Sequence, residues 1–139
     1  MANPSAITLV GFIAWALALL ILMELLRGYL VMFKGVPANE FRPDNGNLSP
    51  FMQRLARAHA NCVEGLPIFG GLLLLALITG QTAITDPLAY TLLGARLIQS
   101  CVHLVSRSTP AVFIRFAAFA VQLAVATVWA VHLFSVFIK

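Results

Sequence analysis

The amino-acid sequence predicts an all-α integral membrane protein, a four-transmembrane-helix bundle that forms a single domain over residues 1–139. The first supporting observation is the composition: 60% of the residues are hydrophobic and 10% are charged, whereas about 25% of the residues of a soluble domain are charged. The second observation is that four apolar stretches each reach the roughly 20 residues that a spanning helix needs. Turn-forming segments with Pro, Gly and Asn separate these stretches.

The first helix is predicted over residues 6–33, within which residues 7–23 carry no charge. Glu24 and Arg27 follow, and their spacing of three places them on one helix face, where they can pair. A polar loop rich in Pro and Asn follows this helix, and it is the longest segment predicted to be non-helical.

Cap-and-proline signals mark the starts of later helices. Ser49 followed by Pro50 is a suitable N-cap with a suitable first helical residue, and Asp86 followed by Pro87 repeats the signal. Gly80 is a suitable stop for the second helix. The predicted helices therefore span residues 6–33, 50–79, 87–106 and 111–138.

The remaining composition excludes several classes of site. The net charge is +4, but no run of Lys and Arg is of the kind that binds nucleic acid, so no nucleic-acid partner is expected. Cys62 and Cys101 lie in apolar segments of separate helices, and we expect them to be buried packing residues rather than a disulfide. No second Cys or His lies at ligand spacing from either cysteine, so no metal site is expected.

The basic residues of the loops predict the orientation in the membrane. They are Arg27, Lys34, Arg42, Arg54 and Arg57 for the first loop and its flanks, and Arg107 and Arg115 for the third. The second loop has no Lys or Arg. The positive-inside rule therefore places the first and third loops in the cytoplasm and both termini on the opposite side. The compact length and the absence of eukaryotic targeting signals point to a bacterial inner membrane.

A polar stripe on the second helix is the main candidate for chemistry. Spacings of three, four and three place four side chains on one face that runs into the membrane, namely Arg54, Arg57, Asn61 and Glu64. A charged side chain at the middle of a spanning helix costs roughly 2.5–3.5 kcal/mol, so the Glu64 carboxylate needs a partner. Arg96, inside the third helix, is the natural candidate. Two interpretations stay open: a purely structural Glu64–Arg96 pair, or a polar binding cavity open to the cytoplasm.

Further polar residues lie on the last two helices. Arg96, Gln99 and His103 are three and four residues apart and share a face of the third helix, while Arg115 stands at the cytoplasmic start of the fourth. Arginine is suited to binding carboxylates through two parallel hydrogen bonds, and Glu64 could bind an ammonium group. Such a site matches a small zwitterionic ligand with several carboxylates. Glutathione is one such molecule, although these residues alone do not select it.

The segment Arg54-x-x-Arg57-Ala58-His59-x-Asn61-x-x-Glu64-x-x-Pro67 resembles the signature of the MAPEG family, the membrane-associated proteins in eicosanoid and glutathione metabolism. Ala95-Arg96 resembles the family's Ala/Gly-Arg on its third helix, and Arg115 resembles the arginine that opens the fourth. With four helices and this length, the resemblance points to a member similar to the microsomal glutathione transferases.

The resemblance implies a homotrimer of four-helix subunits that binds glutathione as co-substrate between neighbouring subunits, near the cytoplasmic face. By matched position, Arg57, Asn61 and Glu64 belong to one subunit, and His59, His103 and Arg115 face the same glutathione from its neighbour. Arg115 inherits the role of holding the glutathione thiolate. The residues expected to support the site are Arg54, Arg96 and Gln99.

The sequence also departs from the family pattern. Gln53 replaces a glutamate, while Gly65 and His103 each stand where other members have a tyrosine. Leu30 occupies approximately the place of a basic residue at the end of helix one, for which Arg27 and Lys34 are candidate substitutes. These departures bear on activity more than on fold.

The leading expectation is a membrane-bound glutathione transferase, with peroxidase activity as a further option, that uses the thiolate to attack lipophilic electrophiles arriving from the membrane lipid. Such an enzyme would serve detoxification. The alternatives are a non-catalytic MAPEG-like protein that binds a small ligand, and a small membrane transporter. A basic cleft around Glu64 is poorly suited to the cationic drugs that such transporters carry.

Overall fold

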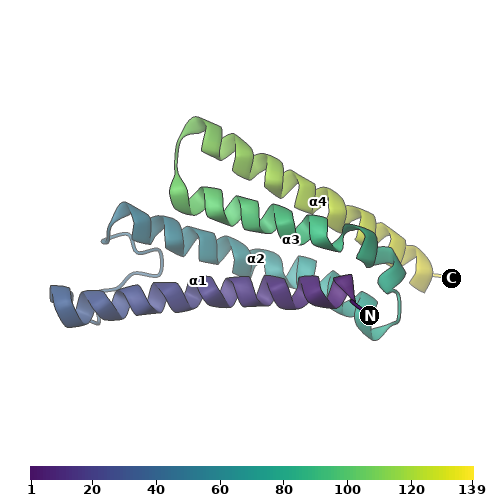
Figure 1. Cartoon of the computed structure of the whole chain (residues 1–139), viewed down its shortest axis with the longest axis horizontal. Coiled ribbons are helices and arrows are strands. Elements are labelled where there is room, and N and C mark those ends of the chain that lie inside the picture. The colour runs from purple at the N-terminus through teal and green to yellow at the C-terminus, as the bar shows by residue number, and fades with distance from the viewer.

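The computed structural model describes all 139 residues, from Met1 to Lys139. The chain forms four helices, α1 (Pro4–Lys34), α2 (Pro50–Ile78), α3 (Thr82–Val105) and α4 (Thr109–Phe137), and each is long and apolar enough to cross a membrane. Successive helices run in opposite directions, so that both termini lie at one end of the bundle (Figure 1). The predicted all-α, four-helix membrane fold is therefore confirmed.

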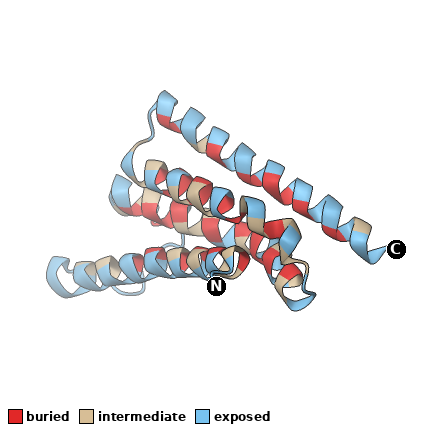
Figure 2. Cartoon of the chain, turned by 45° about the vertical axis from the view of Figure 1, so that its right-hand side comes forward, coloured by how far each residue is buried: buried red, intermediate tan, exposed pale blue.

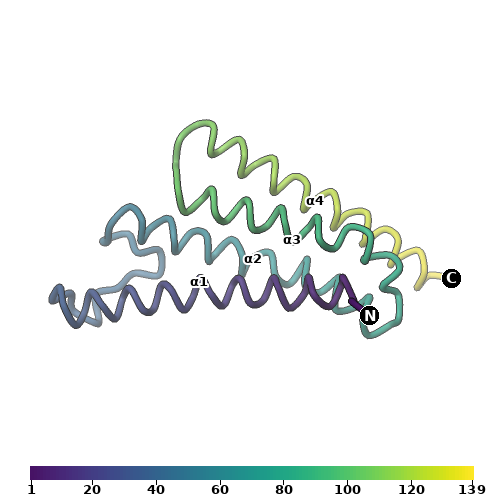
Figure 3. The backbone as a smooth tube through the Cα atoms, in the orientation of Figure 1, coloured from purple at the N-terminus to yellow at the C-terminus, as the bar shows by residue number.

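The helices are arranged with α2 and α3 in the middle and α1 and α4 at the two edges (Figure 3). α1 packs against α2 and α3, whereas α4 packs mainly along α3 and touches α2 more narrowly, and α1 makes no contact with α4. The narrow α2–α4 contact leaves space between these two helices, and the candidate site lies there.

The outer surface of the helix bundle is suited to contact with lipid rather than with water. Only 32 of the 139 residues are buried, and exposed residues cover the outer faces of all four helices (Figure 2). Large apolar side chains such as Phe113, Phe116 and Phe134 are among those that are exposed. A soluble monomer rarely shows so much contiguous apolar surface, so the exposed faces are suited to hydrocarbon.

Most helix ends follow the cap signals of the sequence. Ser49 accepts a hydrogen bond from the backbone N–H of Met52, with Pro50 as the first helical residue. Asn3 caps α1 in the same way, and Gly35 ends it with a positive φ of 67°. The segment 108–110, expected as a turn, contains the Ser108 N-cap and the first residues of α4.

The start of α3 was predicted wrongly. The helix begins at Thr82 rather than at Pro87, and Pro87 lies inside it. Asp86 is not an N-cap, because its Oδ1 accepts hydrogen bonds from the backbone N–H of Ser5 at 3.1 Å and from the Ser5 hydroxyl at 2.6 Å. Asp86 thus ties the start of α1 to the first turns of α3, which an Asp-Pro pair in the sequence does not reveal.

Arg27 holds the first loop against the bundle. Its predicted ion pair with Glu24 forms at 3.0 Å. The same guanidinium donates to the Asn45 side-chain oxygen from Nη2 at 2.6 Å and from Nε at 3.1 Å, and Asn45 in turn donates to the Met52 carbonyl at 2.8 Å. Asn45 is fully buried and has a positive φ of 54°. The Arg27 side chain is therefore occupied in contacts that hold the first loop in place.

The two cysteines differ in their surroundings. Cys62 is buried in the core, as expected, with its sulfur 3.5 Å from the Ser100 hydroxyl oxygen. Cys101 is exposed, so its predicted burial is wrong. An apolar segment that faces lipid on one side gives the same sequence signal as one that is fully enclosed.

Candidate functional site

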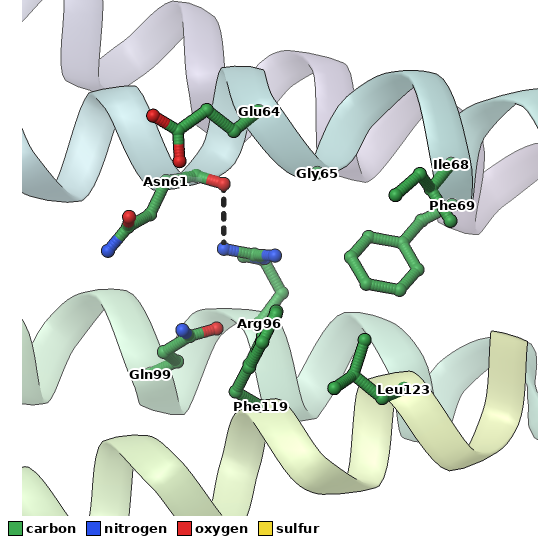
Figure 4. Close-up of a pocket in the computed structure, with 9 residues that line it drawn as sticks. All are labelled: Asn61, Glu64, Gly65, Ile68, Phe69, Arg96, Gln99, Phe119 and Leu123. Carbon is green, nitrogen blue, oxygen red and sulfur yellow. Dashed lines mark hydrogen bonds between the residues drawn. The ribbon is translucent and has the colours of Figure 1, made fainter.

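A cavity of about 370 Å³ lies between α2, α3 and α4. One part of its wall is polar and the other apolar (Figure 4). The polar side chains are Asn61, Glu64, Arg96 and Gln99, and the other lining residues are Gly65, Ile68, Phe69, Phe119 and Leu123. Four of the residues that the sequence assigned to glutathione binding or to its support are thus brought to one place.

Arg96 is the buried cation of this cavity, with only 1% of its surface exposed. Its Nη1 donates to the backbone carbonyl of Asn61 at 3.3 Å, and its guanidinium carbon lies 5.0 Å from the ring centroid of Phe12 and 5.6 Å from that of Phe69. Its Nε and Nη2 have no hydrogen-bond partner. Cation–π contacts and one carbonyl therefore hold the charge, and two of its donor nitrogens are buried without a partner.

The predicted Glu64–Arg96 ion pair does not form. The one ion pair in the chain is Arg27–Glu24, while Glu64 is exposed and lies across the cavity from Arg96, on α2 (Figure 4). The physical reason is that the two aromatic rings and the Asn61 carbonyl fix the guanidinium on the core side. The structure thus contains an unpaired carboxylate and an unpaired guanidinium along the wall of one cavity.

Gly65 makes the position of Arg96 possible. A Cβ at this residue would lie 2.8 Å from Arg96 Nη2 and 2.9 Å from a ring carbon of Phe69. Real Cβ atoms essentially never approach other atoms so closely. The departure at Gly65 therefore removes an aromatic wall and also leaves the space that the Arg96 guanidinium occupies.

Three amide side chains and one imidazole form hydrogen-bond contacts beside the cavity. The Asn61 side-chain nitrogen is 3.4 Å from His103 Nδ1, and Gln122 donates to the Gln99 side-chain oxygen at 2.8 Å. Sequence reasoning missed Gln122, which is fully buried on α4. The available signal was an amide within an otherwise apolar helix. These contacts connect α2, α3 and α4 at one level of the bundle.

Basic side chains surround His103 at the end of the bundle formed by the first and third loops. His103 is buried, with 8% of its surface exposed, and it lies within the electrostatic range of four guanidinium groups, those of Arg54, Arg57, Arg107 and Arg115. Arg54 donates from Nε to the Leu104 carbonyl at 2.9 Å, whereas the partly buried Arg115 Nε has no partner. The chain thus concentrates positive charge at this end of the bundle.

The predicted site residues differ in how far one chain brings them together. Asn61 and His103 touch within one subunit, so a single subunit can present both to one ligand. Arg57 is exposed on the surface of α2, and His59 is half-buried on another face of the same helix. The assignment of these residues to neighbouring subunits of a trimer stays a prediction.

Fold and site together define a class of protein: a polytopic membrane protein with four spanning helices and, between α2, α3 and α4, a cavity whose polar wall includes an arginine. The chain matches the model of the MAPEG family over residues 6–135. The match covers all four helices, and the chain therefore belongs to the MAPEG family. No curated protein and no solved structure matches it.

Proposed function

We propose that this protein is a glutathione transferase of the membrane, which binds glutathione near the cytoplasmic face and holds its sulfur as a thiolate. The observation that carries the proposal is a set of charges without ion-pair partners: four guanidinium groups around His103, and the Glu64 carboxylate one turn from Asn61. Glutathione has two carboxylates for arginine and one ammonium for glutamate, so its charges complement this arrangement.

The chemistry needs a cation rather than a protein nucleophile. A free thiol has a pKa near 8.5 and is mostly protonated at neutral pH, and the thiolate is the reactive form. An adjacent cation lowers such a pKa by roughly 1–3. Arg115, whose Nε has no partner in the chain, is the group we assign to the thiolate. The activated sulfur then attacks a lipophilic electrophile or reduces a peroxide.

Assembly as a homotrimer is part of the proposal. Arg57 and Glu64 are exposed on the monomer, and a neighbouring subunit that covered this face of α2 would enclose the ligand between two chains. The positive-inside rule places the basic end of the bundle in the cytoplasm, where glutathione is dissolved, and a bacterial inner membrane is the compartment we infer.

The test uses the purified protein in detergent. The protein is titrated with glutathione while the ultraviolet absorbance of the thiolate is recorded, and this absorbance should saturate. Addition of a chloronitrobenzene should then convert the bound thiolate to the conjugate. Saturable thiolate with conjugate supports the transferase. Absence of both would overturn the proposal.

A non-catalytic, ligand-binding member is the second candidate, and one observation favours it. Arg27, a candidate substitute for the missing basic residue of helix one, is bound to Glu24 and Asn45 and is not available to a ligand. Glutathione binding by calorimetry without any thiolate absorbance would select this second candidate.

A further inference from the structure

Gln122 is a polar side chain on α4 that the proposed function does not use. None of its surface is exposed, and its Oε1 has no hydrogen-bond partner. A buried polar atom without a partner destabilises a fold, so an apolar residue of similar size would serve packing better at this position. The other polar atom of the amide, Nε2, makes two hydrogen bonds, and these have a fixed direction.

The direction of the two bonds follows from a main-chain atom. Gln122 Nε2 donates to the Ala118 carbonyl at 3.1 Å and to Gln99 Oε1 at 2.8 Å. A backbone carbonyl only accepts, so the nitrogen rather than the oxygen of the Gln122 amide must face Ala118. The second hydrogen of that nitrogen then requires an oxygen from Gln99. Gln122 therefore holds Gln99 with its oxygen toward α4 and leaves Gln99 Nε2 without a partner in the chain.

Gln99 Nε2 is open to the polar cavity. Gln99 lines the cavity, and its amide end projects from α3 toward α2 (Figure 4). The residue has 8% of its surface exposed, and its Nε2 is not one of the enclosed polar atoms that lack a partner. The two unpartnered nitrogens of Arg96, in contrast, are enclosed. A ligand in the cavity can therefore reach the donor on Gln99.

The other polar side chains of the cavity offer no comparable donor. Glu64 is a carboxylate, which only accepts. The Asn61 side-chain nitrogen is occupied by its contact with His103 Nδ1 at 3.4 Å. Arg96 has only 1% of its surface exposed. The cavity thus combines a carboxylate, which suits an ammonium group, with one reachable amide donor, which suits a ligand oxygen.

We propose that Gln122 is a positioning residue of the glutathione site: it turns the Gln99 amide so that Nε2 donates to the carboxylate that shares a carbon with the glutathione ammonium group. This inference rests on the proposed function, in which Glu64 binds that ammonium group. Glu64 and Gln99 line the same cavity of about 370 Å³, so a carboxylate attached to the same carbon enters the cavity with the ammonium. Gln122 does not line the cavity and acts only through Gln99.

The physical effect of Gln122 is preorganisation. An amide has two orientations that differ by a half-turn and exchange its nitrogen with its oxygen. Without Gln122, the Gln99 amide could present its oxygen to the cavity, where it would repel a carboxylate. Gln122 excludes this orientation before the ligand binds, so the binding free energy is not spent on turning the amide.

The experiment compares two ligands by calorimetry with the purified full-length protein. One is glutathione, and the other is 4-aminobutanoyl-cysteinylglycine, which keeps the ammonium and thiol groups and lacks only the carboxylate in question. Gln122→Met should weaken glutathione binding about threefold to tenfold, because the donor to a charged group is no longer oriented. The affinity for the analogue should change less than about twofold, since the contact that Gln122 orients is absent there. Equal losses with both ligands would show a purely structural role and overturn the inference.

Thr127→Val is the matched control variant. The Thr127 hydroxyl donates to the Leu123 carbonyl, four residues earlier in α4, just as Gln122 donates to the carbonyl of Ala118. The control therefore removes the same kind of contact with the main chain of α4 at a residue that does not line the polar cavity. Neither affinity should change. A loss of glutathione affinity as large as that of Gln122→Met would assign the effect to α4 itself and contradict the role of Gln122.

A double-variant cycle tests whether Gln122 acts through Gln99. Gln99→Met should weaken glutathione binding about tenfold, the loss of one hydrogen bond to a charged group. Gln99→Met combined with Gln122→Met should bind no more weakly than Gln99→Met alone, because Gln122 has nothing left to orient. Losses that multiply in the combined variant would mean that the two residues act independently, and the inference would be wrong.

Failure of the proposed function can be distinguished from failure of this inference. If the wild-type protein binds no glutathione, the proposed function fails, and the direction of the amides is then measured without ligand. In protein labelled with ¹⁵N-glutamine, the Gln99 side-chain NH₂ should exchange with water quickly and that of Gln122 slowly. Similar exchange of both groups would overturn the positioning role. This measurement uses the wild-type protein, so it decides the question even if Gln122→Met does not fold.

Discussion

Replacing Gly65 by alanine tests how closely α2 is fitted to Arg96. The new Cβ would lie 2.8 Å from Arg96 Nη2 and 2.9 Å from Phe69 Cε2, whereas ordinary contacts begin at 3.4 Å, so a shift of about 0.6 Å (3.4 minus 2.8) is needed. The guanidinium is the end of a flexible side chain, but the rings of Phe12 and Phe69 restrict it. Its bond to the Asn61 carbonyl is already 3.3 Å long and has little room to stretch.

The expected change in the free energy of unfolding of Gly65→Ala combines a gain in helix propensity with losses in packing and hydrogen bonding. Alanine is favoured over glycine inside a helix by about 1 kcal/mol. Overpacking of a fitted core costs about 1–3 kcal/mol, and loss of a hydrogen bond from a charged donor adds about 1.5–3 kcal/mol when it breaks completely. With partial loss of that bond, we expect Gly65→Ala to lower the free energy of unfolding by about 1–3 kcal/mol.

The assay measures unfolding by circular dichroism in one detergent, with Gly71→Ala as the control variant. Gly71 lies on the same helix and has nothing within 4 Å of an added Cβ, so its alanine variant should be as stable as wild type or more stable by up to about 1 kcal/mol. If both variants were equally stable, the close fit of Gly65 to Arg96 would be refuted.

The remaining predictions concern single side chains. Arg115→Ala should abolish the thiolate absorbance while the protein stays folded; a thiolate signal equal to wild type would remove Arg115 from that role. Glu64→Gln should weaken glutathione binding at least about tenfold, because a charge-assisted contact is lost. The melting temperature should not change, because Glu64 is exposed and unpaired. Calorimetry measures the affinity and melting curves the stability, and an unchanged affinity would contradict the assignment of Glu64 to glutathione. Asn45→Ala should destabilise the fold by about 2–3 kcal/mol, because it removes two hydrogen bonds from Arg27 and the one that the Met52 carbonyl accepts, and should speed proteolysis of the first loop. Asn45→Gly, which retains the positive φ, should lose as much stability; a smaller loss would mean that backbone strain, not the side-chain bonds, decides the effect.

The fold could be predicted well because hydropathy and length decide which segments span a membrane, and these are local properties of the sequence. The start of α3 could not be predicted, since Asp86 followed by Pro87 satisfies the sequence rules for a helix start although the helix begins at Thr82. The true role of Asp86 depends on Ser5, which is 81 residues away in the chain. A contact over such a distance leaves no local signal.

The site could be predicted only in part for a related reason. Helical spacing correctly identified the polar faces of α2 and α3, but it does not give the rotation of one helix relative to another. The Glu64–Arg96 pair was inferred from similar depth alone, and the structure shows that Phe12, on α1, takes part in holding Arg96 instead. The contribution of Gln122 from α4 was missed because one amide carries no periodic pattern.

The burial of Arg96 has a cost in free energy that its contacts offset only in part, because two of its donor nitrogens have no partner. Even a buried ion pair can often be replaced by apolar residues of similar volume without loss of stability, and Arg96 has no ion-pair partner. A methionine at this position would fill the space beside Gly65 and pack against Phe12 and Phe69 without leaving two donors unsatisfied. The chain instead keeps a cation beside the polar wall of its cavity, where two aromatic rings and the Asn61 carbonyl hold it.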